Sequence, residues 1–403
     1  MGYAVGDPSL SLKTIMSKAV YLSEPGIVSP LGATLAANAV ALFAGQRQLM
    51  LDQDLYPGRR VRVGRANAEL LPVPESLREF DCRNNQLLMT ALQSLLPAIS
   101  ELKTHTPSAR IGVVIGSSTS GIAAGEQAIA QQLQNGETAK TFNYRQQEIG
   151  TPALFVARYL ELNGPALTIS TACTSSTQAL ISARALIEAD LCDAVVVGGA
   201  DSLCQLTIQG FSALESYSEN FCQPFAQSRD GINIGEGAIV FIMGKSPTSY
   251  RLLGAGASSD AHHISAPHPD GVGAEQAIRA ALADADLSAD AIDYVNLHGT
   301  ATPKNDEMEA AVMHRVFGSE LPCSSTKSLT GHMLGAAGAM EVAACLLALK
   351  QQQLPVQTAP MPYDPALPAL NLVTVPSQAT LNTVMSTNYA FGGSNVALIL
   401  QRA

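Results

Sequence analysis

Short apolar runs recur along the chain and alternate with alanine-rich stretches. The runs have the length and the β-branched content of buried strands, and the stretches between them are long enough for helices. Strands that alternate with helices predict an α/β fold in which helices cover the sheets. The predicted strands are Ala19–Leu22, Ile111–Ile115, Ala166–Ser170, Ala194–Gly198, Ala238–Met243, Tyr294–Leu297 and Val396–Leu400.

A turn-like segment near the middle divides the chain. The sequence GKSPTS at residues 244–249 is rich in turn-forming residues, and the patterns on its two sides are comparable. We therefore predict an N-terminal half, residues 16–250, and a C-terminal half, residues 251–403. Residues 1–15 are polar and weakly patterned, so we expect them to be a leader that precedes a natural start at Met16.

Composition limits the class of protein. The 403 residues are 47% hydrophobic and 14% charged, which is enough apolar material for a large core. The net charge of −10 and the lack of long basic runs argue against nucleic acid as the main ligand. We see no apolar stretch of membrane-span length and no signal-peptide core, so we expect a cytoplasmic protein without membrane association. The seven cysteines never form CxxC, which favours reduced thiols.

The segment around Cys173 combines a β-branched run, small hydroxyl residues and an amphipathic stretch that carries Leu180 and Ile187. This pattern predicts a strand, a tight turn and a helix, with Cys173 at the helix N-terminus. Free backbone N–H groups and the helix dipole there favour a thiolate, and the same N–H groups could hold an oxyanion. A cysteine among small residues is more often a packing residue, so this segment alone leaves both interpretations open.

Two histidines lie in similar glycine- and threonine-rich surroundings. His298 follows a predicted strand in HGTATPKND, and His332 lies in KSLTGHMLGAAGAME (327–341), which leads into a helix that ends near Lys350. A single histidine at a strand end is usually structural. Two such sites in a chain with only seven histidines favour catalysis.

Together these segments resemble the β-ketoacyl-[acyl-carrier-protein] synthases, namely the elongating Cys-His-His ketosynthases of type II fatty-acid and polyketide synthesis. The resemblance runs from about Ala19 to the C-terminus. It is also carried by QPFAQSRDGINIGEGA (223–238), SDAHHISAPHPDG (259–271) and NYAFGGSN (388–395). It implies a thiolase-like five-layer α-β-α-β-α fold with two pseudo-symmetric halves, an active site between the halves, and a dimer.

The resemblance also implies a decarboxylative Claisen condensation without a metal or redox cofactor. Cys173 would take an acyl chain from the phosphopantetheine arm of an acyl carrier protein, with the backbone N–H groups of Cys173 and Phe391 as the oxyanion hole. Malonyl carrier protein would then lose carbon dioxide, and His298 and His332 would stabilise the enolate. The product would be a β-ketoacyl chain two carbons longer.

Further roles follow from the same resemblance. Lys327 would orient the histidines together with Glu341, although the two could form only a structural ion pair. Ala226 stands where the family usually has an acidic residue. Substrate contacts are implied for Thr300, Thr302, Phe225, Phe391 and Gly392. A monovalent cation could lie near Asn296, Glu341 and Ser386.

Two other functions remain open at this point. A chain-length-factor-like subunit would be a non-catalytic partner, but such subunits generally lack the nucleophilic cysteine. A thiolase or initiating synthase would carry a second catalytic cysteine near the C-terminus or replace one histidine by asparagine, and neither feature is found. The sequence leaves open the acyl chain length, a fatty-acid or an aryl-polyene or polyketide pathway, and a homodimer or a heterodimer with a chain-length-factor homologue.

An acidic carrier protein would need a local basic surface on this acidic chain. One group of candidates is close together in the sequence, and the others are scattered. The candidates are Arg59, Arg60, Arg62 and Arg65, and then Arg78, Arg83, Lys140 and Arg145.

Overall fold

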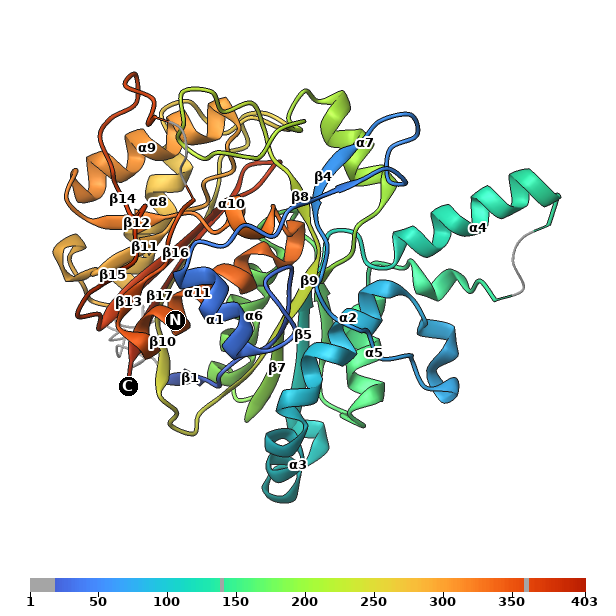
Figure 1. Cartoon of the computed structure of the whole chain (residues 1–403). Coiled ribbons are helices and arrows are strands. Elements are labelled where there is room, and N and C mark those ends of the chain that lie inside the picture. The colour runs from blue at the N-terminus through green and yellow to red at the C-terminus, as the bar shows by residue number, and fades with distance from the viewer. Residues whose placement is uncertain (1–18, 138–140, 359–361) are drawn as a thin grey trace, which may run out of the picture.

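The computed structural model describes residues 19–137, 141–358 and 362–403, and Figure 1 shows the path of the chain. The predicted leader, the start at Met16 and the docking candidate Lys140 lie outside the described residues. Each apolar run that the sequence predicts as a strand is a strand in the structure. The α/β prediction is therefore confirmed at the level of its elements.

The two halves repeat one strand order. In each half the first three strands are parallel to their neighbours, and the fourth is antiparallel to the third and to the fifth. This repetition is the predicted pseudo-symmetry. The N-terminal order is β6 (Ala166–Ile169), β5 (Ile111–Gly116), β7 (Ala194–Asp201), β9 (Gly237–Gly244) and β1 (Val20–Leu22). The C-terminal order is β12 (Pro322–Ser324), β11 (Tyr294–Asn296), β16 (Thr383–Tyr389), β17 (Ser394–Arg402) and β10 (Tyr250–Ser259).

The first strand joins the halves into one continuous sheet. β1 pairs antiparallel with β9 on one side and with β10 on the other. β2 (Gly26–Val28) pairs with β9, and β14 (Asn371–Leu372) extends the far edge beyond β12. The segment 245–249 connects β9 to β10, and the domain boundary placed there stays a prediction.

Three of the four hydrophobic clusters of the described residues fill the spaces between the main helices and strands. The central cluster lies between the halves and contains residues of α6 and α11, while the other two lie beneath the helices on the outer faces. Figure 1 shows the same order: outer helices, strands, α6 with α11, strands, outer helices. The predicted five-layer fold is confirmed. The helices are α2 (Arg83–Leu92), α3 (Leu96–His105), α5 (Thr151–Tyr159), α6 (Ser175–Glu188), α8 (Val272–Asp284), α9 (Pro303–Phe317) and α11 (Ala337–Gln351).

The central helix corrects one expectation about apolar length. The stretch Leu334–Gln351 has 18 residues and a mean hydropathy of 1.3. By length and composition alone, it could cross a membrane. However, 89% of this stretch is buried inside the protein. The apolar composition therefore belongs to a helix that is surrounded by the core.

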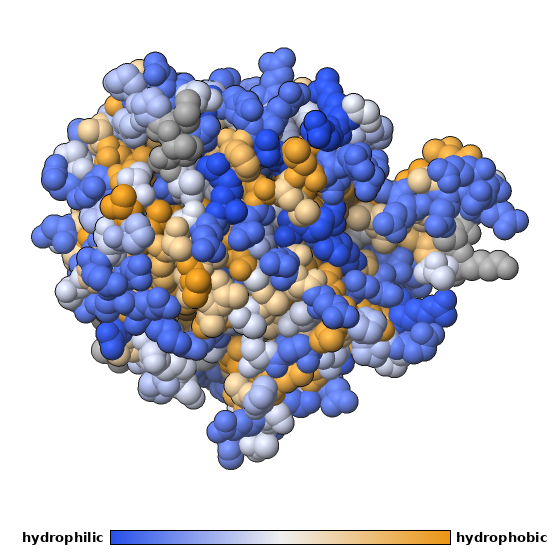
Figure 2. All heavy atoms as spheres, in the orientation of Figure 1, coloured by the Kyte–Doolittle hydropathy of each residue, from blue (hydrophilic) through white to orange (hydrophobic). Residues whose placement is uncertain are grey.

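The remaining elements lie at the periphery. α4 projects from the body, and Figure 2 shows apolar side chains on it beside hydrophilic ones. A small sheet of β3, β4 and β8 lies next to α7. The bounds are α1 (Leu35–Phe43), α4 (Ile122–Asn135), α7 (Gln205–Ala213), α10 (Lys327–Thr330), β3 (Met50–Asp52), β4 (Val61–Gly64), β8 (Ile234–Gly235), β13 (Gln353–Leu354) and β15 (Ser377–Gln378).

Candidate active site

Three loops that follow parallel strands bring the predicted trio together. Cys173 follows β6, His298 follows β11, and His332 lies between β12 and α11. One donor atom from each side chain lies within 4.8 Å of the other two. All three residues are buried, with 5%, 1% and 2% of their surfaces exposed in that order. The interface between the halves therefore holds a sheltered thiol and two sheltered imidazoles.

The turn before α6 presents Cys173 as the sequence predicted. Ala172 has a φ of 51°, a conformation that costs energy for a residue with a side chain, and its carbonyl accepts the N–H of Ser175 at 3.1 Å. Close packing holds the turn, because a Cβ on Gly116 of β5 would lie 2.3 Å from the nitrogen of Ser176. The strand, turn and helix are confirmed.

The protonation state of the thiol differs from the expectation. Burial raises the pKa of Cys173 to about 11, which outweighs the lowering by the positive charge of Lys327 and by the backbone N–H of Phe391. The expected preference for thiolate at the helix N-terminus is therefore wrong for this closed pocket, because removal from water disfavours the anion. The N–H groups of Phe391 and of Cys173 both donate towards the sulfur, as the predicted oxyanion hole requires.

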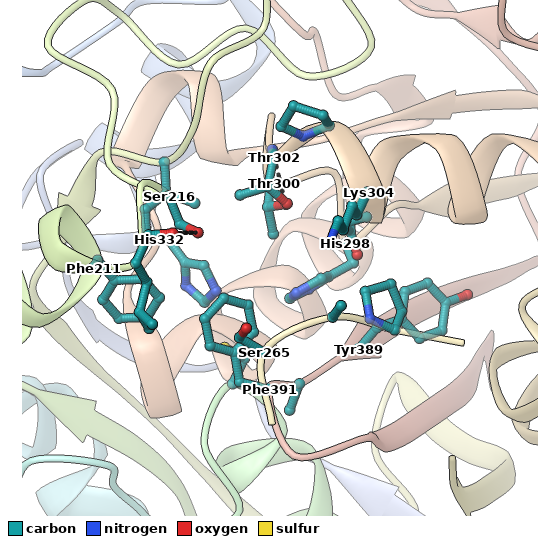
Figure 3. A pocket seen from close by; sticks show the side chains of 18 of the residues that line it. Phe211, Ser216, Ser265, His298, Thr300, Thr302, Lys304, His332, Tyr389 and Phe391 are labelled. Atoms are coloured by element: carbon teal, nitrogen blue, oxygen red, sulfur yellow. Dashed lines mark hydrogen bonds between the residues drawn. The ribbon is translucent and has the colours of Figure 1, made fainter. Parts of the chain in front are cut away.

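The two histidines are fixed as hydrogen-bond donors towards the cavity. The N–H of Leu334 donates to Nδ1 of His332 at 3.0 Å, and Nζ of Lys327 lies 3.3 Å from Nδ1 of His298. A backbone N–H and an ammonium can only donate, so the proton of each imidazole is on Nε2. Burial and the charge of Lys327 hold both pKa values well below the ordinary range, so the rings are neutral. Figure 3 shows the two rings directed into the space beside Phe391.

The same tautomers bear on metal binding. Cys173, His298 and His332 have the spacing of a group that could hold a metal ion. Each Nδ1 already accepts a hydrogen bond, however, so binding through Nε2 would require an imidazolate. The two histidines are therefore better suited to donate hydrogen bonds to an oxyanion than to bind a metal ion.

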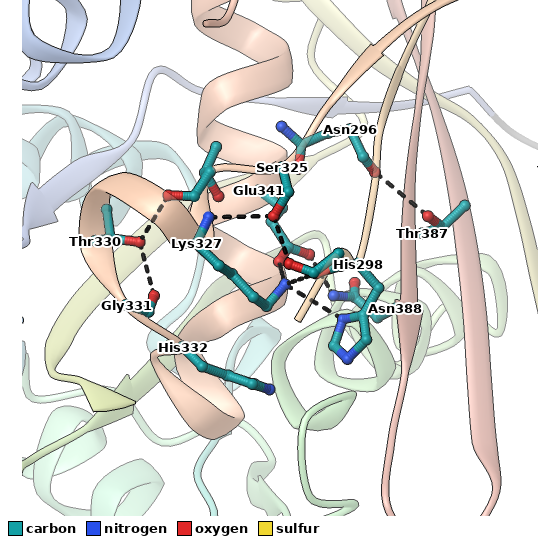
Figure 4. A network of polar contacts seen from close by, with 12 residues as sticks. Asn296, His298, Ser325, Lys327, Thr330, Gly331, His332, Glu341, Thr387 and Asn388 are labelled. Atoms are coloured by element: carbon teal, nitrogen blue, oxygen red, sulfur yellow. Dashed lines mark hydrogen bonds and ion pairs between the residues drawn. The ribbon is translucent and has the colours of Figure 1, made fainter. Parts of the chain in front are cut away.

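A buried ion pair supports His298. The ammonium of Lys327 contacts the carbonyl oxygen of His298 and Oε1 of Glu341, and Oε2 of Glu341 accepts from the amide of Asn388. Figure 4 shows this chain of contacts between α10, α11 and β16. Burial raises the pKa of Glu341, and Lys327 opposes that shift. The predicted contact between Lys327 and Glu341 is present, and it extends to the imidazole.

A second carboxylate was missed by sequence reasoning. Glu309 of α9 accepts the N–H of His298 and the N–H of Gly299, each at 2.7 Å, and burial raises its pKa to about 8. It thus holds the backbone of the His298 loop. The available signal was an acidic residue on the helix that begins directly after HGTAT.

The trio opens into a cavity of about 290 Å³. Thr300 and Thr302 line it and share a hydrogen bond of 2.9 Å between their hydroxyls. The ring of Phe391 lines it as well and lies 5.3 Å from the ring of Phe211, which the sequence did not single out. Other lining residues are Leu214, Glu215, Ser216, Ser265, Lys304 and Tyr389.

Two predicted substrate-binding residues are not in the cavity wall. Phe225 is fully buried, and a Cβ on Gly299 would lie 3.1 Å from its ring, so Phe225 packs behind the His298 loop. Gly392 has a φ of 85° and donates its N–H to the carbonyl of Ile264 at 2.9 Å. A positive φ at Gly392 suits the turn that carries Phe391.

The predicted cation region holds buried oxygens without partners. Oδ1 of Asn296, Oγ of Ser386 and Oδ1 of Asn388 are buried and have no hydrogen-bond partner in the described part of the chain. Unsatisfied buried oxygens of this kind indicate a bound ion or water. Oxygen donors of amide and hydroxyl type next to Glu341 fit a monovalent cation.

The arginine candidates differ in their availability. Arg83 donates at 2.8 Å and 2.5 Å to Glu236, whose side chain is fully buried, so its charge is engaged in a structural ion pair and its role in docking stays a prediction. Arg145 and Arg78 pair with Glu79 and Glu75. The other ion pairs of the candidates are Arg65 with Asp52 at 2.6 Å and Arg59 with Glu219 at 3.9 Å.

Comparisons with known proteins agree with this geometry. The sequence model described as "Beta-ketoacyl synthase, N-terminal domain" matches residues 67–247, and "Beta-ketoacyl synthase, C-terminal domain" matches residues 250–359. The "3-oxoacyl-[acyl-carrier-protein] synthase 2" of Coxiella burnetii is 32% identical over 95% of this chain and 98% of its own. The chain belongs to the β-ketoacyl synthase family. It is an acyltransferase of the ketosynthase type.

Solved ketosynthases share the fold. A chain in the structure of a ketosynthase in complex with its chain length factor, from Xenorhabdus doucetiae, is 44% identical, with a TM-score of 0.93 over 96% of this chain and 98% of that one. A chain of the ishigamide ketosynthase/chain length factor is 25% identical, with a TM-score of 0.88 over 96% of this chain and 100% of that one. The alternative of a non-catalytic subunit is not favoured, because this ketosynthase carries Cys173 with both histidines.

Proposed function

We propose that this ketosynthase condenses malonyl carrier protein with an acyl chain held on Cys173. The observation that carries the proposal is the pair of Nε2–H groups of His298 and His332, which lie beside one thiol at the end of the cavity. Donors fixed in advance stabilise an oxyanion without reorganisation when the charge develops. No metal or redox cofactor enters the proposal.

In the first half-reaction, the sulfur of Cys173 attacks the carbonyl carbon of a carrier-bound thioester. The N–H groups of Cys173 and Phe391 hold the oxyanion. The carbon–sulfur bond to the carrier arm breaks, and the proton lost by the thiol replaces the acyl group on the departing sulfur. Because burial raises the pKa of Cys173, the thiol loses its proton only as the new bond forms.

In the second half-reaction, malonyl carrier protein loses carbon dioxide, and the electron pair forms an enolate. The thioester oxygen of the enolate accepts hydrogen bonds from Nε2–H of His298 and of His332. The enolate carbon attacks the acyl carbon on Cys173, and the carbon–sulfur bond to the enzyme breaks. The sulfur leaves as a thiolate and takes up one proton from water, which restores the thiol for the next cycle. Lys327 and Glu341 hold His298 in the donating tautomer, and Thr300 and Thr302 offer hydroxyls to the pantetheine arm.

We also infer that a monovalent cation binds beside this site. Asn296, Ser386 and Asn388 would provide its oxygen ligands, with Glu341 nearby. The ion would fix the ends of β11 and β16 and would take no part in the chemical steps.

A chain-length-factor homologue is the proposed partner, and a homodimer is the alternative outcome. The support is the likeness to two ketosynthases whose structures include chain length factors. β6 is an edge strand, and its Leu167 is 43% exposed. On the projecting helix α4, Ile129 and Leu133 are 60% and 82% exposed. Exposed apolar groups and a free strand edge fit a partner subunit. This partner favours a specialised pathway, such as aryl-polyene or polyketide synthesis, over general fatty-acid elongation.

The carrier protein is proposed to dock beside the small β3–β4 sheet. Arg60 and Arg62 have no carboxylate within ion-pair distance among the described residues, and the N–H₂ group of Gln205 on α7 contacts this segment through the carbonyl of Asp54 at 3.3 Å. α7 carries Phe211 of the cavity wall. Figure 2 shows hydrophilic side chains over this part of the surface. An acidic carrier placed there would be close to the cavity mouth.

One assay tests the proposed function. The purified enzyme, alone and with the co-expressed partner, is incubated with malonyl carrier protein and a panel of acyl carrier proteins, and the carrier-bound products are identified by mass. The expected product is a β-ketoacyl chain two carbons longer than its primer. Unextended primers in every combination, with the acyl carrier proteins intact, would contradict the proposal.

A further inference from the structure

A buried carboxylate lies between the cysteine turn and the second histidine turn. Asp201 is the last residue of β7 and is fully buried. Its Oδ1 accepts from Oγ of Ser117 at 2.8 Å and from N and Oγ1 of Thr119 at 2.9 Å and 2.8 Å. Its Oδ2 accepts from N of Gly335 at 2.6 Å, and N of Ser118 lies 3.0 Å from both oxygens.

These donors show that Asp201 faces both halves of the fold. Ser117, Ser118 and Thr119 form the turn after β5 in the N-terminal half, and Gly335 belongs to the C-terminal half. In the described part of the chain, every donor to Asp201 is a hydroxyl or a backbone N–H, and no cation is among them. A carboxylate held in this way serves as an acceptor for several backbone groups.

On one side, the contacts of Asp201 extend through Ser118 to the turn that carries Cys173. Ser118 donates its hydroxyl to the carbonyl of Ala172 at 3.0 Å, and Ala172 is the residue with a positive φ directly before Cys173. The strained turn needs surrounding contacts to persist. Asp201 supplies them indirectly by fixing the backbone of Ser118.

The other side leads to His332. Gly335 follows Leu334, whose N–H fixes the tautomer of His332. A Cβ on Gly335 would lie 2.7 Å from Oδ2 of Asp201 and 2.8 Å from N of Ser118, so the two turns approach at a distance that only glycine allows. The N–H of Gly335 thus binds the carboxylate of Asp201, and the N–H of the preceding residue, Leu334, binds His332.

We infer that Asp201 is a positioning residue that couples the Cys173 turn to the His332 turn across the two halves. The inference rests on the proposed roles of Cys173 and His332. Oδ2 holds the histidine turn through a single residue of the C-terminal half, whereas Oδ1 has several donors from the turn after β5. Loss of the Oδ2 acceptor should therefore affect decarboxylation more than acylation.

The test compares two half-reactions in the same variants. Acylation of Cys173 by an acyl carrier protein is followed by intact mass, and carbon dioxide release from malonyl carrier protein is measured without a primer. In Asp201→Asn, the amide oxygen should keep the several donors at the Oδ1 position, which places the N–H₂ group against the N–H of Gly335. We expect decarboxylation to fall about tenfold or more and acylation to fall less than about threefold.

A second variant reverses the selectivity. Ser118→Ala removes the hydroxyl that holds Ala172 and leaves the N–H that binds Asp201, so acylation should fall about three- to tenfold while decarboxylation is retained. The matched control is Asp293→Asn, because Asp293 also accepts two backbone N–H groups, from Asn382 and Thr383, but lies outside the cavity wall. The control should keep the wild-type ratio of the two rates.

Equal factors of loss in both half-reactions of Asp201→Asn, or no loss in either, would overturn the inference. If Asp201→Asn does not fold, Ser118→Ala carries the test, because it leaves the carboxylate and its backbone donors intact. A selective loss of acylation is then expected, and an equal loss in both half-reactions would overturn the inference. A wild-type enzyme that performs neither half-reaction would contradict the proposed function instead.

Discussion

The ammonium nitrogen of Lys327 lies 3.3 Å from Nδ1 of His298. The contact has two effects on the imidazole. It leaves Nδ1 without a proton, so Nε2 carries it, and its positive charge disfavours a second proton on the ring. Burial of the ring lowers the pKa of His298 more than the lysine does. Burial and Lys327 together make His298 a neutral donor, which is the form that stabilises an enolate without first giving up a proton.

Replacing the nucleophile should remove acyl-enzyme formation and leave the fold intact. Cys173→Ala deletes one sulfur from a buried site, so only a small volume is lost, whereas the thioester needs that sulfur. Intact mass after incubation with an acyl carrier protein should show no adduct. The control Cys192→Ala deletes the same atom from another buried position and should keep the adduct. An acyl adduct on Cys173→Ala would refute the assignment.

His332→Ala should separate the two half-reactions. The variant loses one of two donors to the enolate, and loss of an oxyanion donor typically costs about a hundredfold to a thousandfold in rate. Acylation of Cys173 should be partly retained, because its oxyanion hole is made of backbone N–H groups. Carbon dioxide release is the measurement, and His314→Ala, a change at an exposed histidine, is the control. Unchanged carbon dioxide release would exclude the role.

The buried histidines should make stability depend on pH. The pKa of His332 is lowered in the folded state, so below its ordinary value of about 6.5 the unfolded chain takes up a proton that the folded chain does not. The contribution to the free energy of unfolding is therefore present at neutral pH and is lost as the pH falls, by up to about 1.4 kcal/mol per pH unit.

Other buried groups titrate over this range with the opposite sign. Glu309, whose pKa is raised to about 8, favours the folded state as the pH falls. The informative quantity is thus the difference in the free energy of unfolding between wild type and His332→Asn, measured by urea unfolding at pH 7, 6 and 5. We expect the advantage of wild type to shrink towards pH 5. A constant difference would show that His332 titrates normally.

The cation proposal predicts a specific salt effect. Potassium chloride should raise the melting temperature above that in tetramethylammonium chloride of equal concentration, because an ion bound only by the folded state adds about 1.4 kcal/mol at ten times its dissociation constant. Ser386→Ala removes one proposed ligand and should reduce the difference between the two salts. Equal melting temperatures of the wild type in both salts would contradict the site.

The docking proposal predicts a change in one substrate only. Charge reversal at the exposed Arg60 should raise the apparent KM for carrier-bound substrate. The salt dependence of that KM should become weaker, because screening then has less attraction to remove. Turnover of a small pantetheine thioester should be unchanged. Arg279→Glu on α8 is the control, since that arginine is also exposed and lies on the C-terminal half. Equal losses with both substrates would indicate damage to the active site instead.

The sequence predicted seven of the strands and missed others, among them β10, β12 and β16. β10 shows one physical reason for a miss. β10, the longest strand of the C-terminal half, reads YRLLGAGASS and has few β-branched residues. A Cβ on Gly256 would lie 2.1 Å from the carbonyl oxygen of Ala277, and one on Gly254 would lie 2.4 Å from that of Ala281. The backbone of α8 therefore packs directly on this strand, and small residues replace the usual apolar signal.

The active site likewise has residues that the sequence could identify and others that it could not. Cys173 and the two histidines could be singled out because their segments carry characteristic residue types. The pKa of Cys173 could not, because it depends on burial that only the tertiary structure reveals. Asp201 and Glu309 were missed because they act on backbone N–H groups, which leave no trace in the residue types of their partners.

The position of β1 affects how the chain can fold. Val20 pairs with Leu252, and Leu22 pairs with Met243. The first described strand therefore cannot pair until segments more than 200 residues along the chain are present. Such long-range pairing slows folding, because a large loop must close before any contact forms. It also means that the open edge of β10 in the C-terminal half is covered only by a strand of the N-terminal half. The two halves, although similar in plan, should therefore unfold in a single cooperative transition and should not be obtainable as separate soluble fragments.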